Sequence, residues 1–300
     1  MTRPVPTCFD YELTEETLMD KTNVILPTRR SAMLSAAALA APAALLSGVH
    51  PVAQAQTAQS QTPQNQAAKT FVLVHGAYGG GYVWKYVAAN LRAKGHRVFT
   101  PTLTGLADKS HLMSKDISLA THVADIVNPI KWEDLRNVTL VGHSYGGWPV
   151  SAVPEQVGDA IGSIVFLDAF LPNDGQKGLD LNSPPSRAAV LDAISRGEVS
   201  RPAVPSRSKG MSAADSEWLL TKANPQPIGV SLDPIKLTGA RERVAKKAYI
   251  RARNFPNPNF DAFYETTKVA GWQVFDLPSG HNIQVEMPDR LTDILLTLAA

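Results

Sequence analysis

Short apolar runs that alternate with helical stretches constrain the fold of this chain more than any other feature. The helical stretches carry apolar residues at every third or fourth position. They occupy residues 81–95, 118–127 and 145–158. The apolar runs are rich in β-branched and aromatic residues, and they occupy residues 70–76, 96–103, 137–144, 162–170, 246–253 and 272–278. Parallel strands need crossover connections, which helices supply, so the alternation predicts an α/β domain over residues 70–300, with helices on both faces of a mostly parallel sheet.

The composition excludes several classes of function. The chain has 300 residues, a formal net charge of +2 and interspersed acidic and basic residues, so it suggests no nucleic-acid partner. Its single cysteine, Cys8, rules out an internal disulfide and a cysteine-rich metal site. It also argues against a cysteine nucleophile. We therefore expect a small-molecule substrate and no metal, while the oligomeric state stays open.

Residues 1–55 have the features of an export signal. Arg29 and Arg30 precede an alanine- and leucine-rich run over residues 35–48, and Ala53 and Ala55 then stand at the A-x-A spacing of a signal-peptidase site. The paired arginines indicate the Tat route, with cleavage after Ala55 and a periplasmic or secreted mature protein. A membrane anchor is less favoured, because the run is dominated by alanine and broken by proline. We expect no membrane association after cleavage.

Residues 56–69 form a glutamine-rich leader. They lack aromatic and branched apolar side chains, so they cannot bury enough surface to order themselves and are predicted to be flexible. The segment before the arginines is long for a signal, and Met19 is an alternative start.

Residues 171–245 interrupt the alternation. They contain no clear strand and several prolines, and they include two helix-like stretches at 186–195 and 212–222. The second opens with Ser212 and Asp215 at capping-box spacing. A helical insertion between sheet strands predicts a lid over the C-terminal edge of the sheet, where open α/β sheets bind their ligands.

A G-x-S-x-G pattern follows one of the apolar runs. Ser144 is flanked by Gly142 and Gly146, after the run Val138 to Val141 and before a helical stretch. At a strand-to-helix turn, flanking glycines let neighbouring segments pass close by while the serine hydroxyl stands clear of the sheet. This context identifies Ser144 as a nucleophile, whereas a tight turn with a solvated serine is the plainer alternative.

A serine nucleophile needs a base. His281 follows the last apolar run, so it should lie at the same sheet edge as Ser144, and it is our candidate for the general base. His96 and His122 fall at a strand start and within a helix, where packing or surface roles are expected. His111 lies in a loop that could touch substrate.

The negative charge that develops on a carbonyl oxygen during attack needs backbone donors. One is the amide of Tyr145, directly after the nucleophile. The other should come from the glycine-rich loop after the first apolar run, with Ala77 as the preferred donor and Tyr78 as the next. His75 and Gly76 are expected to shape that loop.

These motifs together resemble the α/β-hydrolase superfamily. The stretches FVLVHGAYGGGYVW, VGHSYGGW, VFLDAFLP and SGHN are most similar to the branch of plant methyl-salicylate esterases, hydroxynitrile lyases and bacterial carboxylesterase relatives. The similarity spans about residues 71–295 and is weakest across the lid. It implies the α/β-hydrolase fold, a serine–acid–histidine triad, no cofactor and a pocket between lid and sheet. By position, the nucleophile is Ser144, the base is His281, and Ala77 and Tyr145 supply the oxyanion amides.

The acid of the triad is where this chain departs from the resemblance. Many members carry an aspartate where this chain has Asn254 or Phe255. Asp168 ends the run that follows the nucleophile strand, and it keeps the order serine, acid, histidine. A lone aspartate in an apolar run also needs a partner if it is buried. Asp168 is therefore the preferred acid, with Asp261 or no charged acid as alternatives.

The reaction predicted from these residues is hydrolysis of a carboxylic ester through an acyl-enzyme, on a small hydrophobic or aromatic substrate. Amide and lactone substrates remain open on the same triad. A hydroxynitrile-type lyase is disfavoured, because Asn282 stands where those relatives carry a lysine. A non-catalytic ligand-binding protein is the remaining alternative. Tyr78 and Trp218 are candidate substrate contacts, although Trp218 fits lid packing equally well, and Trp84 is assigned to the core.

Overall fold

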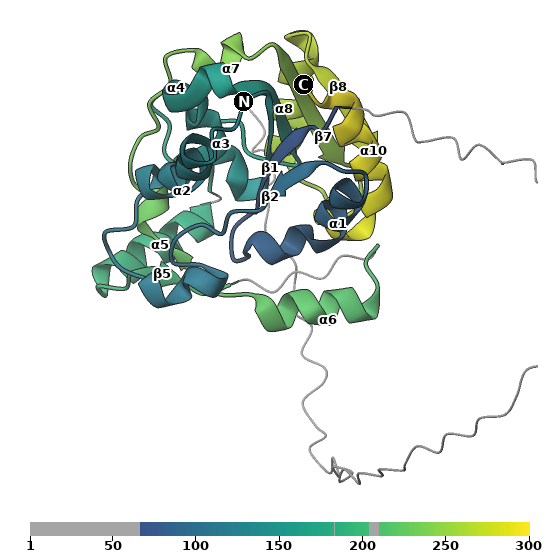
Figure 1. Cartoon of the computed structure of the whole chain (residues 1–300). Coiled ribbons are helices and arrows are strands. Elements are labelled where there is room, and N and C mark those ends of the chain that lie inside the picture. Colours follow the sequence, from purple (N-terminus) through teal and green to yellow (C-terminus); the bar gives the residue numbers. More distant parts are fainter. Residues whose placement is uncertain (1–66, 183, 204–209) are drawn as a thin grey trace, which may run out of the picture. The chain divides into compact units, whose positions relative to one another are not determined.

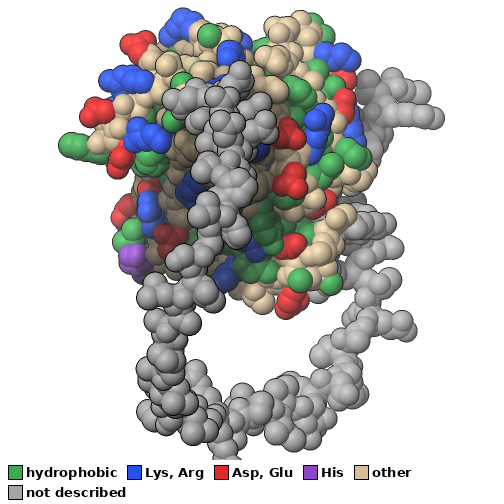
Figure 2. Space-filling model, turned by 45° about the vertical axis from the view of Figure 1, so that its right-hand side comes forward, with side chains coloured by type: hydrophobic (Ala, Val, Ile, Leu, Met, Phe, Trp, Pro, Cys, Tyr) green, Lys and Arg blue, Asp and Glu red, His purple; other side chains and the backbone are tan. Residues whose placement is uncertain are grey.

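The structure is a computed structural model that describes residues 67–182, 184–203 and 210–300. The predicted export signal and most of the leader lie outside the described residues. No helix in these three ranges is long and apolar enough to span a bilayer. On the described surface visible in Figure 2, basic and acidic side chains are interspersed.

Six parallel strands form the central sheet, in the order β2-β1-β3-β4-β7-β8 (Figure 1). Each of the six apolar runs in the sequence forms one strand. The strands are β1 (Thr70–Val74), β2 (Arg97–Phe99), β3 (Val138–His143), β4 (Ile161–Leu167), β7 (Lys246–Ala252) and β8 (Gln273–Leu277). The prediction of an α/β domain is therefore confirmed.

Helices cover both faces of this sheet (Figure 1). α1 and α10 pack on one face, and α2, α3 and α8 pack on the other. The helices that flank the sheet are α1 (Lys85–Ala93), α2 (Leu119–Trp132), α3 (Gly147–Ala152), α4 (Pro154–Val157), α7 (Ala240–Arg243), α8 (Pro258–Val269), α9 (Ile283–Glu286) and α10 (Pro288–Leu298). Short 3₁₀ turns lie at Gly81–Trp84, Ala107–Leu112, Ser144–Gly146, Gly158–Ala160, Gly178–Leu181 and Gly229–Ser231.

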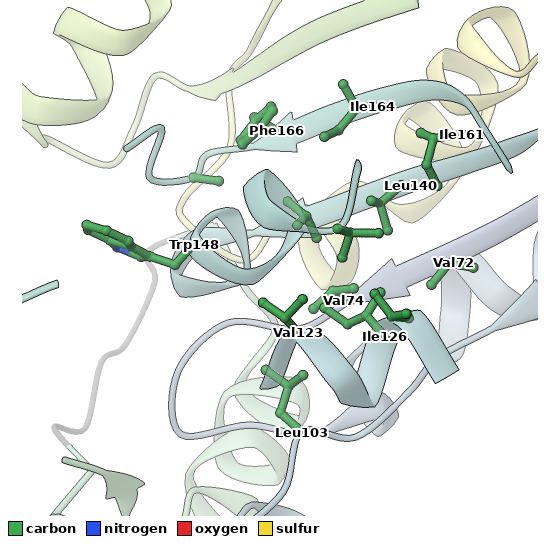
Figure 3. Close-up of a cluster of buried hydrophobic side chains, with 14 of the residues drawn as sticks. Val72, Val74, Leu103, Val123, Ile126, Leu140, Trp148, Ile161, Ile164 and Phe166 are labelled. Carbon is green, nitrogen blue, oxygen red and sulfur yellow. The ribbon is translucent and has the colours of Figure 1, made fainter. Parts of the chain in front are cut away.

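The strands are buried on both faces, which explains why they read as continuous apolar runs. Side chains alternate along β1: Phe71 and Leu73 pack towards α1 and α10, whereas Val72 and Val74 pack towards α2. Figure 3 shows the second of these clusters, in which strand residues such as Leu140 meet α2. Full burial of one such side chain contributes roughly 1.5–3 kcal/mol, so this core fixes the ends of the strands firmly.

The part of the insertion between β4 and β7 that carries α5, β5 and α6 lies in the lower part of Figure 1. It contains α5 (Pro184–Ser195), β5 (Ser200–Arg201), α6 (Ala213–Lys222) and β6 (Gln226–Pro227). Both predicted helices are present, and the Ser212 hydroxyl caps α6 by accepting from the amide of Asp215 at 3.0 Å. The expectation of no strand in this segment is wrong, because β5 and β6 pair antiparallel. Two-residue strands are too short to leave a periodic signal in the sequence.

Candidate active site

Ser144 lies at a sharp turn between β3 and α3. Its φ is +52°, in the left-handed region that most residues avoid. The turn is closely packed against its neighbours: a Cβ on Gly142 would lie 2.6 Å from the Val150 side chain, and one on Gly146 would lie 2.8 Å from the His75 carbonyl oxygen. The two glycines of the motif are therefore required by close approach, and the strained turn presents the serine hydroxyl above the end of β3.

His281 joins Ser144 to Asp168 through two short hydrogen bonds. The Ser144 hydroxyl lies 2.8 Å from His281 Nε2, and His281 Nδ1 lies 2.7 Å from Asp168 Oδ2. Because a carboxylate can only accept, Nδ1–H donates to Asp168 and Nε2 is free to accept the serine proton. These three residues come from positions far apart in the sequence, and they meet at the carboxyl ends of β3, β4 and β8.

Asp168 is held in place from the side opposite His281. It is fully buried, with φ at +43°. Its Oδ1 accepts from Arg251 Nη1 at 2.7 Å and from the amide of Ala252 at 3.1 Å. A buried carboxylate with these partners is not left unpaired. The other candidate acid, Asp261, accepts from Arg251 Nε at 2.9 Å and does not reach the imidazole.

The position at which the family resemblance implies an aspartate has a different use in this chain. The ring of Phe255 stacks on His281, with centroids 4.4 Å apart and an angle of 25°. The amide of Asn254 donates to the carbonyl of Ser279 at 3.0 Å, which ties the loop after β7 to the loop that carries the base. An aromatic face and a backbone contact thus orient the imidazole from this side, while the carboxylate comes from the end of β4.

Two buried histidines hold the catalytic loops. His143 Nε2–H donates to the carbonyl of His281 at 2.9 Å. His75 accepts from the amide of Leu103 through Nε2 at 3.1 Å and donates from Nδ1 to the carbonyl of Gly76 at 2.7 Å. Burial lowers the pKa of His143 well below its usual value and that of His75 to about 4. Both rings are therefore neutral at neutral pH and serve as fixed hydrogen-bond bridges.

The loop after β1 lies directly against Ser144, the candidate nucleophile. A Cβ on Gly76 would lie 2.9 Å from Ser144 Cβ, so only glycine allows the loop to come this close. The amide of Ala77 donates to no acceptor in the described part of the chain. The amide of Tyr145 lies in the first turn of a helix, where N–H groups have no intrahelical partner. The amides of Ala77 and Tyr145 are the two that the sequence predicted as donors to the oxyanion.

The insertion clamps this loop at Tyr78, whose φ is +63°. The Tyr78 amide donates to Gln226 Oε1 at 3.1 Å. Its carbonyl accepts from the Asn224 amide at 3.0 Å and from Asn224 Nδ2 at 3.2 Å. Three hydrogen bonds from Asn224 and Gln226 of the insertion therefore set the geometry of the residue next to Ala77.

A cavity of about 770 Å³ opens above Ser144 and His281. Its wall combines the catalytic loops with the insertion and includes the aromatic side chains of Tyr78, Tyr82, Tyr145, Trp148, Phe170, Phe255 and Phe260.

The buried side chain of His122 has a structural role. Its Nδ1 accepts a hydrogen bond from the Tyr145 hydroxyl at 2.9 Å.

Two residues proposed for substrate contact are placed elsewhere. Trp218 is not among the residues that line the cavity, although Leu219 and Leu220 are. Its indole packs edge-on against Tyr82, and the Lys85 ammonium lies over it at 3.5 Å. Trp218 thus packs against α1 and the preceding turn, which fits the packing role that the sequence favoured equally. His111 is exposed and also lies outside the cavity wall.

Several residues of the site were missed by sequence reasoning. Arg251 donates to the Asp168 carboxylate. The sequence feature that could have revealed this role is the occurrence of an arginine within the apolar run of β7. Gln226 and Arg201 lie in strands too short to be recognised. Within the described ranges, no group of three or more His, Cys, Asp or Glu residues is arranged to hold a metal ion.

The parallel sheet, the strained serine turn and the serine–histidine–aspartate contacts define an α/β protein of the serine hydrolase class. A family model described as the alpha/beta hydrolase family matches residues 71–294. The carbendazim hydrolyzing esterase of Nocardioides sp. (strain SG-4G) is 36% identical over 243 residues, which cover 76% of this chain and 98% of that protein. The chain therefore belongs to the alpha/beta hydrolase family, and the predicted hydrolase class and resemblance are confirmed.

Further comparisons agree with this membership. Salicylic acid-binding protein 2 of Nicotiana tabacum is 38% identical over 110 residues, which cover 35% of this chain and 41% of that protein. Among solved structures, an extracellular alpha/beta-hydrolase from a Paenibacillus species superposes with a TM-score of 0.68 at 23% identity, covering 77% of this chain and 99% of the other. The α/β-hydrolase fold expected from the sequence motifs is thereby confirmed.

Proposed function

We propose that this protein is a serine esterase that cleaves carboxylic esters of small, hydrophobic or aromatic molecules through an acyl-enzyme on Ser144. One observation carries the proposal: the Ser144 hydroxyl lies 2.8 Å from His281 Nε2, and His281 Nδ1 lies 2.7 Å from Asp168. A serine hydroxyl becomes a competent nucleophile when a base so oriented accepts its proton during attack.

The reaction proceeds in two halves. Ser144 Oγ attacks the ester carbonyl carbon, its proton passes to His281 Nε2, and the amides of Ala77 and Tyr145 donate to the oxyanion. The tetrahedral intermediate collapses, His281 returns the proton to the leaving alcohol, and the acyl group stays on Ser144. Water then attacks the acyl-enzyme with His281 as base, which releases the acid and restores the serine. Asp168 stabilises the imidazolium that forms in each half.

The substrate class is supported by the cavity and by the relatives. The aromatic side chains of Tyr78, Trp148 and Phe170 line a space of about 770 Å³, which suits a small molecule with an apolar or aromatic body. A protein that matches most of this chain is named for hydrolysing carbendazim, and others are named methylesterases. These names favour esters of small molecules over macromolecular substrates.

Replacement of the nucleophile tests the proposal. We expect Ser144→Ala to lower kcat for phenyl acetate by at least about 10³-fold while the thermal unfolding midpoint changes little. The matched control is Ser110→Ala, which alters an exposed serine and should keep full activity. A fluorophosphonate probe should label the natural chain at Ser144 only. Undiminished turnover by the Ser144→Ala variant contradicts the proposal.

A substrate panel separates the rival activities on the same site. Anilides and lactones matched to the best ester test amidase and lactonase activity, and mandelonitrile tests cyanohydrin cleavage. Asn282, at the cavity wall, brings no positive charge to a departing cyanide, so release of cyanide is not expected. Labelling of Ser144 without turnover of any member of the panel would favour a ligand-binding protein.

The export signal is proposed on the sequence alone. Arg29 and Arg30, followed by an alanine-rich run and the A-x-A spacing at Ala53 and Ala55, support Tat export with release after Ala55. Replacement of both arginines by lysine should retain the precursor in the cytoplasm, and amino-terminal sequencing of the exported protein should begin at Gln56. A mature protein that begins elsewhere contradicts the cleavage site.

A further inference from the structure

The β5–β6 hairpin of the insertion carries two hydrogen-bond donors that have no acceptor among the residues that the structure describes. Arg201 lines the cavity, and its Nε is buried without a partner in these ranges. Gln226 lies directly opposite Arg201 in the register of the hairpin and is fully buried. Its Oε1 accepts from the Tyr78 amide, whereas its Nε2 has no acceptor. Buried donors are nearly always satisfied in folded proteins, so the unpaired Nε of Arg201, a residue of the cavity wall, points to an acceptor supplied by a ligand, whereas Gln226 lies behind that wall.

The charge of Arg201 is also unused by the protein. Within the described ranges, its guanidinium forms no ion pair. It lies over the ring of Tyr78, with Cζ 5.3 Å from the ring centroid. Arg196 lines the same cavity but differs, because it donates to Glu198 Oε1 at 2.8 Å and to Asp192. The two acidic side chains of this wall are thus engaged by Arg196, and Arg201 is left as an uncompensated positive charge facing the cavity.

Arg201 lies beside the loop after β1, with its Cζ 5.3 Å from the centroid of the Tyr78 ring. Burial raises the pKa of the Tyr78 and Tyr145 phenols, and the positive charge of Arg201 opposes that rise. Tyr145 directly follows the nucleophile, and Tyr78 directly follows Ala77 in the loop against it. Arg201 thus lies next to the loop that carries Ala77 and in the same cavity wall as Ser144 and His281.

We propose that Arg201 binds a carboxylate of the substrate that is remote from the ester being cleaved. A guanidinium offers the donors and the charge that a carboxylate accepts best, and binding would satisfy the orphan Nε. The inference rests on the proposed esterase function and narrows its substrates to half-esters of dicarboxylic acids or esters of carboxylated phenols. The aromatic wall then holds the body of the molecule between its charged end and Ser144.

Two matched ester pairs test this subsite. Monomethyl terephthalate against dimethyl terephthalate places the carboxylate on the acyl side, and 4-acetoxybenzoate against its methyl ester places it on the leaving-group side. For one of the pairs, we expect Arg201→Gln to raise KM for the charged ester about ten- to hundredfold while KM for the neutral ester changes less than twofold. Arg201→Lys should recover part of the loss, because it keeps the charge without the planar donors.

Arg97→Gln is the matched control, since it removes a guanidinium that lies outside the cavity wall and pairs with Glu133. It should leave the ratio of the two KM values unchanged. Equal changes for charged and neutral esters in the Arg201→Gln variant, or the same selective loss in the Arg97→Gln variant, would overturn the proposal.

A binding measurement separates failure of the subsite from failure of the esterase assignment. In the Ser144→Ala background, calorimetry with monomethyl terephthalate and with 4-acetoxybenzoate needs no turnover. For at least one of them, the further change Arg201→Gln should weaken binding at least about tenfold, with dimethyl terephthalate unaffected. Unchanged affinity for both charged esters contradicts the carboxylate subsite, whatever the enzyme assays show.

Discussion

Arg251 Nη1 donates to Asp168 Oδ1 at 2.7 Å, and both side chains are almost completely buried. The same carboxylate uses its other oxygen to accept from His281. Arg251 also donates to the carbonyl of Phe255 at 2.8 Å, so one guanidinium organises the acid and the loop that stacks on the base. The aspartate is thereby locked in the orientation that the imidazole requires.

The first prediction concerns the stability that this buried pair provides. Arg251→Met should lower the free energy of unfolding by about 3–5 kcal/mol, because it leaves the Asp168 carboxylate buried without its charged partner. Urea unfolding followed by circular dichroism measures the change. Arg253→Met is the matched control on the same strand end, where a half-exposed arginine pairs with Asp261 and Asp276, and it should cost less than about 1 kcal/mol. If both variants lose the same free energy of unfolding, the buried pair contributes no more to stability than the exposed one.

The second prediction separates the two candidate acids. Asp168→Asn should lower kcat for an aryl ester by about 10⁴-fold, because an amide cannot hold the imidazole in the required tautomer or stabilise its charged form. Asp261→Asn removes a half-exposed partner of Arg251 and should change kcat by less than about tenfold. Steady-state kinetics with the same aryl ester gives both kcat values. A larger loss for Asp261→Asn than for Asp168→Asn would exchange their roles.

The sheet could be predicted because its strands are buried on both faces. Each strand of the sheet reads as a continuous apolar run, and α1 and α2 carry clear helical spacing. Elements of two to four residues, such as β5, β6 and α7, were not predicted. A periodic signal needs several residues, and these elements depend on tertiary contacts for their conformation.

Candidate site residues could be predicted where a characteristic residue type stands at the end of a predicted strand. Ser144 and His281 follow strands whose ends meet at one edge, and Asp168 stood out as an acid in an apolar run. The supporting contacts were not predictable, because they depend on which strands are neighbours. Arg251 meets Asp168 only because β7 lies beside β4, and Gln226 meets Tyr78 only because the insertion folds back over the sheet edge. In both pairs the two residues are far apart in the sequence, so no local sequence pattern indicates that they are in contact.

The third prediction concerns acid stability and follows from buried neutral histidines. Burial lowers the pKa of His75 and of His122 from 6.5 to about 4. At a pH between about 4 and 6.5, these histidines are protonated in the unfolded chain but not in the folded chain. The free energy of unfolding therefore falls as the pH is lowered through this range. Each histidine contributes a slope of about 1.4 kcal/mol per pH unit within that window. Urea unfolding at pH 7, 6 and 5 measures the slope.

Variants at the His122 contact isolate one of these contributions. His122→Gln should reduce the slope by about 1.4 kcal/mol per pH unit, because it removes one titrating group. Tyr145→Phe removes the hydroxyl that donates to His122 but leaves the ring, so it should lower stability while keeping the slope. If His122→Gln leaves the pH dependence intact, the acid sensitivity originates elsewhere.

The last prediction concerns the close approach of the oxyanion loop to the nucleophile. Gly76→Ala should lower kcat about 10²–10³-fold, because the new Cβ would lie 2.9 Å from Ser144 Cβ and must push the Ala77 amide away from the developing oxyanion. Gly158→Ala is the matched control, since a Cβ there meets no atom within 4 Å, and it should leave kcat unchanged. Steady-state kinetics with a short aryl ester gives the comparison. A Gly76→Ala variant with full activity would remove the loop after β1 from the catalytic machinery and leave Tyr145 as the remaining backbone donor.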